Sequence, residues 1–418
     1  MRFVVFRHRF VIRENLLVTR QFIVLKDDDG SLRFTNFHKY TKSPVNKVKK
    51  YSNDGNSRFQ FVVQFLNFAF FEAQIASLND LTVQIVSEFL TRYGTGTLRS
   101  DNENTTRTED TVKRCVRTIL DFLENFLADP HCSCKFKKDD LFKLVSKRDK
   151  HGRISEVKVP VFDVCYIGYP KEIYRDIPNK AFDILFNHIA VCHTELLGLV
   201  MNSAFAGLRP SSACNVRRTD SPLGAGILFH IVDGEITKIE IDLRKELNLR
   251  SDLLPVGKIK KERMQQVPDI FLNAYKAAYD LYMKYLEGKK YEQDYGAFTV
   301  NKQGRAMTYD SYAQSFRKIV KEELIPIFLA SDDPEVAMYG RILMEHNLSP
   351  HVFWHWFTVQ LVLSGVSDPG TLMFWRGDTS PESALTYLQN KGELEKQYRL
   401  VNNEVFDYML WAAEKKYG

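Results

Sequence analysis

The chain has 418 residues, of which 44% are hydrophobic and 26% charged, a composition typical of globular proteins. A chain of this length exceeds one ordinary hydrophobic core, so we expect two domains with additional segments. The net charge of +6 is compatible with binding a polyanion, but many enzymes that bind none are equally basic. Composition therefore indicates a globular protein and does not identify its partner.

Cysteine usage and the apolar segments predict a cytoplasmic protein. The six cysteines are too sparse for a disulfide framework in a chain of this size. The start, MRFVVFRHRFVIRE, has arginines and a histidine between its apolar runs, so it lacks the unbroken apolar core of a signal peptide. The longest apolar segment, residues 185–208, contains His188, His193 and Glu195, which are costly in lipid. We expect no membrane span and no membrane partner.

Residues 1–57 are expected to form an N-terminal hairpin and a basic arm. Two β-type runs, residues 22–25 and 32–34, flank a turn of sequence Asp-Asp-Gly. The basic stretch at residues 47–50 follows them.

Residues 58–128 are expected to form a compact helical domain. Apolar side chains recur at steps of three and four residues within 59–69, 81–90 and 112–127, which predicts three amphipathic helices. Residues 129–178 then change in composition, with a strand-like run at 157–164, and we interpret them as a linker or insertion that contains the domain boundary.

Residues 179–418 are expected to form a second domain with helices and a small sheet. An apolar helix spans 181–206, and a hairpin follows in which Asp233-Gly234 is the turn between 227–232 and 236–243. A basic, strand-like segment at 258–267 precedes a helix at 270–286 and further helices up to the C-terminus. The sequence thus predicts a mostly α, α+β protein with a small antiparallel sheet.

Four motifs lie in the second domain. They are AGLRPS at 206–211, SPHVFWHWF at 349–357, WRGDTS at 375–380 and TYL at 386–388. None is specific alone, but their order, spacing and helical context resemble the tyrosine site-specific recombinases, the phage-integrase family. In particular, Tyr387 follows Asp378 by nine residues and His351 by thirty-six, which is similar to the family's spacing.

The resemblance implies a fold, an activity and a partner. It implies a helical core-binding (SAM-like) domain and a catalytic domain that close as a C-shaped grip on double-stranded DNA. The implied activity is site-specific breakage and rejoining of DNA through a 3′-phosphotyrosine, by a homotetramer on two DNA sites. Because the phosphotyrosine stores the energy of the broken bond, no cofactor, ATP or metal is expected.

The resemblance also implies catalytic roles for particular residues. Tyr387 is the implied nucleophile, and Arg209 is one of two guanidinium groups that hold the phosphate, because their planar fork matches its oxygens. His351 is the implied proton acceptor or phosphate donor, and Asp378 stands where the family usually has histidine or tryptophan.

A lysine on the β-hairpin is expected to protonate the leaving sugar oxygen. Counting back from Val267-Pro268, which resembles the end of the family's strand pair, favours Lys260. Lys258 and Lys261 remain the alternatives for this role.

Two positions depart from the family pattern. Trp354 stands where the second catalytic arginine is expected, and its neutral indole offers one donor in place of five. Loss of one preorganised donor typically lowers the rate about 100- to 1000-fold. Asp378 is the second departure, and Arg376 is a cation that could compensate if its side chain points inward. The alternative hypothesis is therefore a catalytically impaired, DNA-binding relative, and a third is an unrelated helical interaction protein.

Other motifs have more ordinary interpretations. His351 and His355 are spaced like zinc ligands on a helix, but Val352 stands where zincins have glutamate, so we expect His355 to pack in the core. The His-Cys-Ser-Cys sequence at 131–134 has no second ligand pair and is expected to be a loop. The basic clusters at 47–50, 135–138 and 258–263 are candidate phosphate contacts. A final helix within 398–417 is expected to pack on a neighbouring protomer or on its own chain.

Overall fold

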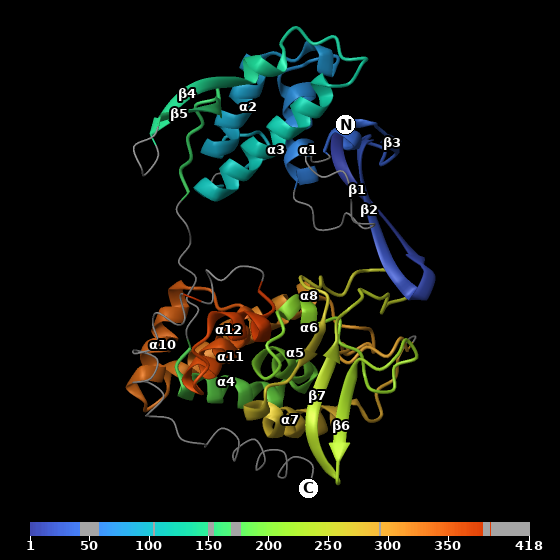
Figure 1. Cartoon of the computed structure of the whole chain (residues 1–418), viewed down its shortest axis with the longest axis vertical. Helices are drawn as coiled ribbons and strands as arrows, with labels where there is room; N and C mark the ends of the chain where they lie inside the picture. The colour runs from blue at the N-terminus through green and yellow to red at the C-terminus, as the bar shows by residue number, and fades with distance from the viewer. Residues whose placement is uncertain are drawn as a thin grey trace. The chain divides into compact units, whose positions relative to one another are not determined.

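The computed structural model describes residues 1–41, 58–102, 105–148, 154–168, 177–291, 294–378 and Leu385 (Figure 1). In this part of the chain, helices predominate and the strands form three small sheets. The predicted fold class, mostly α with small antiparallel sheets, is therefore confirmed.

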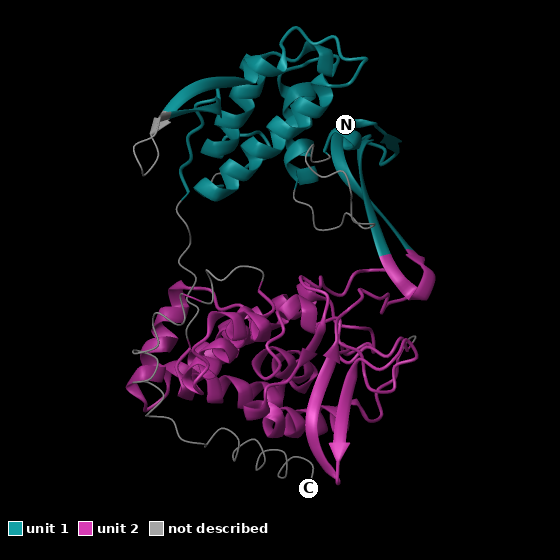
Figure 2. Ribbon diagram, viewed as in Figure 1, with its two compact units in different colours: residues 1–10, 18–171 teal, residues 11–17, 172–418 magenta. Residues whose placement is uncertain are grey.

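The chain divides into two compact units (Figure 2). Unit 1 comprises residues 1–10 and 18–171, and unit 2 comprises residues 11–17 and 172–418. Residues 11–17, the tip of the first hairpin, thus belong to unit 2, where Leu16 forms an antiparallel bridge with Leu247.

Unit 1 begins with a three-stranded sheet in the order β1-β2-β3. The strands are β1 (Arg2–Ile12), β2 (Leu16–Lys26) and β3 (Leu32–Phe34). The predicted hairpin between β2 and β3 is confirmed, with Val24 opposite Phe34. Strand β1 was not predicted, because its arginines and histidine interrupt the apolar alternation that indicates a strand.

Three helices with a shared aromatic core make up the centre of unit 1. They are α1 (Arg58–Asn67), which continues into the π-turn η3 (Phe68–Glu72), α2 (Val83–Thr95) and α3 (Glu109–Leu127). Helix α2 starts at Thr82, whose hydroxyl accepts a hydrogen bond from the amide of Ile85, and ends at Gly96 in the left-handed region. The three predicted helices are confirmed.

A second hairpin completes unit 1. Strands β4 (Phe142–Arg148) and β5 (Ile154–Pro160) pair antiparallel, with Phe142 opposite Pro160. The sequence predicted a strand at 157–164, which overlaps β5, but gave no sign of β4. Before this hairpin, residues 131–134 form the loop that the sequence predicted, and the thiol of Cys134 donates to the carbonyl of Leu78 at 3.6 Å.

The predicted helix at 181–206 of unit 2 is in fact two helices, α4 (Asn179–Cys192) and α5 (Thr194–Ala204). The break is at His193, which has φ −132° and ψ 47°. Apolar periodicity alone does not show such a break, because the apolar residues continue on both sides of it. Helix α5 is buried on nearly all sides and forms the centre of the unit 2 core.

A small antiparallel sheet lies at one edge of unit 2, in the order β6-β7-β8. The strands are β6 (Ile227–Val232), β7 (Glu235–Asp242) and β8 (Met264–Gln266). Asp233 and Gly234 have positive φ of 52° and 85°, so the predicted turn is confirmed. Of the basic segment at 258–267, which the sequence predicted as a strand, only β8 pairs with the sheet.

The remaining helices of unit 2 pack on α5 or on one another. They are α6 (Pro210–Ala213), α7 (Leu272–Leu286), α8 (Tyr309–Ile319), the π-turn η7 (Val320–Leu324), α9 (Ile325–Leu329), α10 (Pro334–Glu345), α11 (His351–Leu363) and α12 (Pro369–Arg376). Helices α7 and α11 both pack on α5. Helix α11 presents buried side chains all round its first two turns, which is typical of a helix inside a core.

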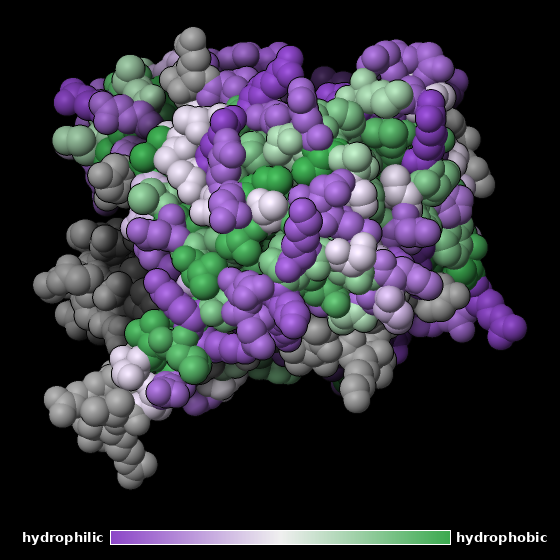
Figure 3. All heavy atoms as spheres, turned by 90° about the horizontal axis from the view of Figure 1, so that it is seen from above, coloured by the Kyte–Doolittle hydropathy of each residue, from purple (hydrophilic) through white to green (hydrophobic). Residues whose placement is uncertain are grey.

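The surface mixes polar and apolar side chains. Figure 3 shows one face, on which hydrophilic side chains are interspersed with hydrophobic ones, as is common for a folded protein. Within the described residues, no helix is both long enough and apolar enough to span a membrane. All six cysteines are free thiols.

Candidate functional site

Arg209 is held at a sharp turn between α5 and α6. Gly207 has φ +65°, and a Cβ there would lie 2.3 Å from the ring of Phe357, so glycine is required both by its conformation and by the close approach of α11. Pro210 then begins α6, a position that suits its fixed φ. The motif at 206–211 thus fixes the backbone from which Arg209 projects.

The Arg209 guanidinium binds the end of α12. Its Nη1 donates to the carbonyls of Arg376 and Gly377, both at 3.3 Å, and its Nη2 donates to Asp378 Oδ1. Cations are favourable at a helix C-terminus, where carbonyls are unpaired. Sequence positions about 170 residues apart are therefore joined in one site.

Arg376 is fully buried beside them, with 1% of its side chain exposed. Its Nε donates to Asp378 Oδ2 at 2.6 Å, and its Nη1 donates to the hydroxyl of Thr358 at 2.9 Å. Asp378 therefore accepts one guanidinium on each carboxylate oxygen, Arg209 on Oδ1 and Arg376 on Oδ2.

Trp354 packs against both of these arginines. The centre of its ring lies 4.0 Å from Cζ of Arg376 and 4.6 Å from Cζ of Arg209, in the range of cation–π contacts. Its Nε1 is buried and has no hydrogen-bond partner among the described residues. Position 354 thus presents an aromatic surface to both guanidiniums, one from α12 and one from the turn before α6.

The pocket next to Arg209 is cationic. Its lining consists of Gly207, Leu208, Arg209, Ser212, Leu243, Lys261, Arg263, Arg376 and Gly377. Arg263 donates to the carbonyls of Phe374 and Trp375 at 2.7 and 3.2 Å. It lies so close to Gly377 that a Cβ there would be 2.4 Å from its Cζ.

Burial and neighbouring charges both shift the pKa values of the pocket arginines. Burial lowers the pKa of Arg209, and repulsion from Arg376 adds to this effect, although Asp378 opposes it. Burial also lowers the pKa of Arg263 to about 10, and Arg209 lowers it further. Both groups stay charged at neutral pH, but an added anion would relieve their repulsion.

The three candidate lysines differ in their position relative to the pocket next to Arg209. Lys261 lines the pocket with Arg209. Lys260 has an exposed side chain and is not among the described residues that line the pocket. Lys258 is also exposed, and its carbonyl accepts a hydrogen bond from the Ser211 hydroxyl at 2.9 Å. Sequence counting alone could not separate neighbours on an irregular segment.

His351 and His355 lie in the first turns of α11. His351 is half-buried, and its ring meets that of Tyr309 edge to face, with ring centroids 6.5 Å apart. Trp354 comes one turn later on the same helix, so His351 and Trp354 lie on neighbouring positions of one face. His355 is buried against Trp354, as the sequence predicted.

Several predicted features fall outside the described residues. These are Tyr387, the basic stretch at 47–50 and the final helix within 398–417. Thr358, in contrast, is a site residue that the sequence analysis missed. Its hydroxyl donates to the Trp354 carbonyl and accepts from Arg376, and no sequence pattern marks a threonine inside an apolar helix.

No protein-family model and no curated protein matches the chain. Among solved structures, it is similar to the XerH site-specific recombinase bound to a palindromic difH substrate (TM-score 0.47, 15% identity, 82% of this chain and 78% of that chain). It is also similar to the Tn1549 transposon integrase in complex with a circular intermediate DNA (TM-score 0.47, 16% identity, 84% and 93%) and to the XerA recombinase (TM-score 0.33, 13% identity, 91% and 99%). These three solved structures are of two recombinases and an integrase.

Proposed function

We propose that this chain is a tyrosine recombinase that breaks and rejoins DNA at specific sites through a 3′-phosphotyrosine. One observation carries the proposal. Arg209, Lys261, Arg263 and Arg376 converge on one pocket, where Asp378 pairs with two of the arginines. The pocket is therefore suited to a further anion.

The charges of the pocket favour a phosphate group. The buried Arg376 offsets the charge of Asp378, so the charges of Arg209, Arg263 and Lys261 remain for a ligand. A guanidinium binds phosphate oxygens through two parallel N–H donors, and the partial burial of Arg209 and Arg263 strengthens such bonds. A backbone phosphate of DNA is an anion of this kind.

Arg263 is the candidate for the second phosphate clamp. Arg376 is adjacent to Trp354, but its side chain is 1% exposed and paired with the Asp378 carboxylate, whereas Arg263 donates to the neutral carbonyls of Phe374 and Trp375. Arg263 is only partly buried, lines the pocket and is close enough to Arg209 for their charges to repel. A guanidinium from the segment before β8 would thus do the work that the family assigns to position 354.

The remaining roles follow the family chemistry. The Tyr387 oxygen attacks the phosphorus while the bond from phosphorus to the 5′ oxygen breaks, and His351 accepts the phenol proton. A lysine gives a proton to the departing 5′ oxygen, and we favour Lys261 because it lines the pocket, with Lys260 as the alternative. The chemistry is electrostatic stabilisation and proton transfer, carried out on duplex DNA by a homotetramer.

Covalent trapping tests this proposal without a known target sequence. The protein is incubated with a pool of duplexes that carry a randomised sequence and a nick beside it, so that the short cleaved fragment diffuses away. Adducts that survive denaturant are isolated, and the attached DNA is sequenced. We expect one enriched sequence joined to the wild-type protein, and no adduct with Tyr387→Phe.

The outcomes separate the competing hypotheses. Salt-sensitive duplex binding without any adduct would favour the alternative, a DNA-binding relative that has lost catalysis, and would reject strand transfer. No salt-sensitive binding at all would reject both and favour a protein-interaction role. Adducts that persist in Tyr387→Phe would place the nucleophile elsewhere.

A further inference from the structure

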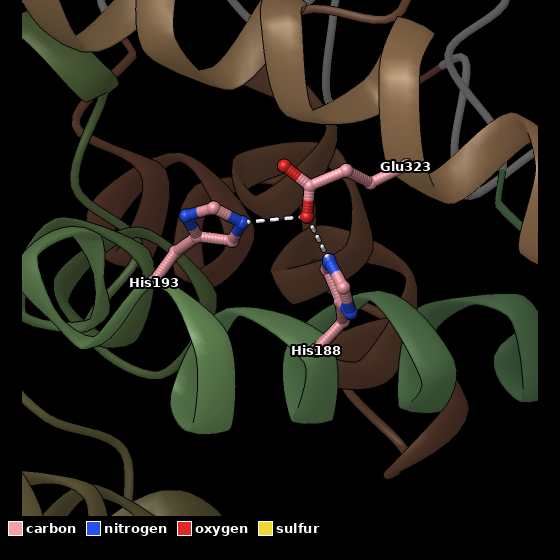
Figure 4. Close-up of side chains that lie close together, drawn as sticks. All are labelled: His188, His193 and Glu323. Atoms are coloured by element: carbon pink, nitrogen blue, oxygen red, sulfur yellow. Dashed lines mark hydrogen bonds and ion pairs between the residues drawn. The ribbon is translucent and has the colours of Figure 1, made fainter.

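Two histidines and a glutamate of unit 2 meet at a site that the recombination chemistry does not use. His188 belongs to α4, His193 lies at the break between α4 and α5, and Glu323 belongs to η7. Figure 4 shows both imidazole rings pointing at the same carboxylate oxygen. The site therefore joins the corner of two core helices to a third segment far along the chain.

The distances bring three potential metal ligands together. Nε2 of His188 lies 2.7 Å and Nε2 of His193 lies 2.8 Å from Glu323 Oε2. All three liganding atoms lie within 4.8 Å of one another. Ligands about 2.1 Å from a tetrahedral Zn²⁺ are about 3.4 Å apart. Side-chain rotations that open the two N–O pairs by about 0.6 to 0.7 Å, and set the two Nε2 atoms at the same spacing, would admit the ion.

Local irregularities of the backbone create this convergence. The conformation of His193, which ends α4, turns the chain so that histidines five positions apart face one point. Glu323 lies in a π-turn, a rare insertion in a helix that is frequent at functional sites. Both departures from regular helix therefore occur at the residues that form the cluster.

The surroundings of the cluster also suit a metal. Glu195 Oε1 lies 3.9 Å from Nδ1 of His193, the ring atom that a metal at Nε2 leaves available. This exceeds a hydrogen bond, but a small rotation would let the carboxylate accept from Nδ1, as outer carboxylates do at metal-bound histidines. The side chains are 16%, 20% and 37% exposed for His188, His193 and Glu323, which leaves a path from solvent.

We propose that His188, His193 and Glu323 bind a divalent transition metal, with Zn²⁺ as the preferred ion. Two imidazoles and one carboxylate suit Zn²⁺, whereas Mg²⁺ and Ca²⁺ prefer oxygen ligands throughout. A water molecule completes the coordination. The ion ties the α4–α5 corner to η7 and stabilises unit 2.

The ordinary alternative is a hydrogen-bonded cluster of two histidines and a glutamate. It would form in the same place without any ion, and it would not respond to chelators. Metal binding and metal-dependent stability therefore distinguish the two.

Titration of the full-length protein tests the site. The protein is stripped with EDTA, dialysed, and titrated with Zn²⁺ by calorimetry, and its unfolding is followed by tryptophan fluorescence with and without the ion. We expect one strong site per chain and, at a hundredfold excess over Kd, a rise in unfolding temperature of about 5 to 10 °C. Absence of a stoichiometric site would reject the proposal.

Matched variants assign the binding to these residues. Glu323→Gln and His193→Gln keep the side-chain shape approximately and remove a ligand, so we expect each to weaken Zn²⁺ binding at least tenfold. The control is His230→Gln, because His230 also pairs with a glutamate, Glu240, at 2.9 Å, but with no third ligand among the residues that the structure describes. Its Zn²⁺ affinity should equal that of the wild type. Unchanged affinity in Glu323→Gln would place the metal elsewhere.

Discussion

Both units of this protein bury arginines next to an aromatic ring and an aspartate, but the two sites differ in how many arginines share one carboxylate. In unit 1, Arg107 pairs with Asp101 through both of its Nη atoms, donates to the Tyr93 carbonyl at 2.7 Å and lies over the Tyr93 ring at 4.1 Å. In unit 2, Arg209 and Arg376 share the single carboxylate of Asp378 and the ring of Trp354.

The difference is visible in the pKa values. Burial disfavours the charge of Arg107, but its hydrogen bonds to Asp101 and the charge of Asp101 outweigh burial and raise its pKa. In unit 2, burial and neighbouring cations lower the pKa of Arg209 and Arg263. One arginine with its own carboxylate is neutral as a group, whereas several arginines that share one carboxylate form a site for an added anion.

The first prediction is that the neutral pair of Arg107 and Asp101 in unit 1 stabilises the fold. Arg107→Met leaves Asp101 buried without its partner, and breaking a buried pair in this way typically costs about 3 to 5 kcal/mol. All four tryptophans lie beyond residue 350, so fluorescence reports on unit 2. We therefore expect faster hydrogen exchange in α2 and α3 and an unchanged tryptophan signal. Slow exchange in the variant would show that the pair contributes little.

The second prediction is that the arginine pocket of unit 2, which has more cations than carboxylates, binds the DNA phosphate. Arg263→Ala removes an accessible guanidinium, and we expect covalent trapping of DNA to slow about 100- to 1000-fold, with the unit 2 core intact by tryptophan fluorescence. Arg341→Ala is the matched control, because it removes the same charge from an exposed position on α10. Equal trapping rates in the two variants would exclude Arg263 as a phosphate clamp.

Much of the fold was predictable because it depends on local patterns. The helices of unit 1 follow their apolar periodicity, and the turn at Asp233-Gly234 follows from residues that tolerate positive φ. The break at His193 and strand β1 were not predictable, because the first lies within a continuous apolar run and the second alternates poorly. Tertiary contacts decide such segments.

The site was predictable in part for a related reason. The sequence marked Arg209 and raised Arg376 as a possible compensating cation, but it could not show that Arg376 is buried against Trp354 and Thr358. Nor could it choose among neighbouring lysines, because the direction of a side chain on an irregular segment depends on packing that spacing does not encode. The pairing of Asp378 with two arginines was also not predictable, because one carboxylate that joins arginines from distant motifs has no sequence signature.

The third prediction concerns Asp378, and it tests whether the charge of its carboxylate limits the binding of an anion in the pocket. We expect this to be the smallest of the three effects. Asp378→Asn keeps an oxygen that can accept from one guanidinium and removes the negative charge that offsets the arginines. If the carboxylate competes with a phosphate for Arg209, the affinity for inorganic phosphate should rise about tenfold, because one opposing charge next to a partly buried site is worth roughly 1 to 2 kcal/mol. Phosphate titration followed by tryptophan fluorescence measures this change.

The same variant could instead bind phosphate more weakly, and that result would contradict competition. It would mean that Asp378 acts chiefly by holding the two guanidiniums in place, so that its loss lets Arg209 turn away from the pocket. Asp378→Glu distinguishes these effects because it keeps the charge and displaces the carboxylate by one methylene. Under competition, Asp378→Glu should bind phosphate as weakly as the wild type, whereas under positioning both variants should lose affinity. Higher affinity in Asp378→Asn alone would therefore show that the excess positive charge, and not the rigidity of the cluster, makes the pocket an anion site.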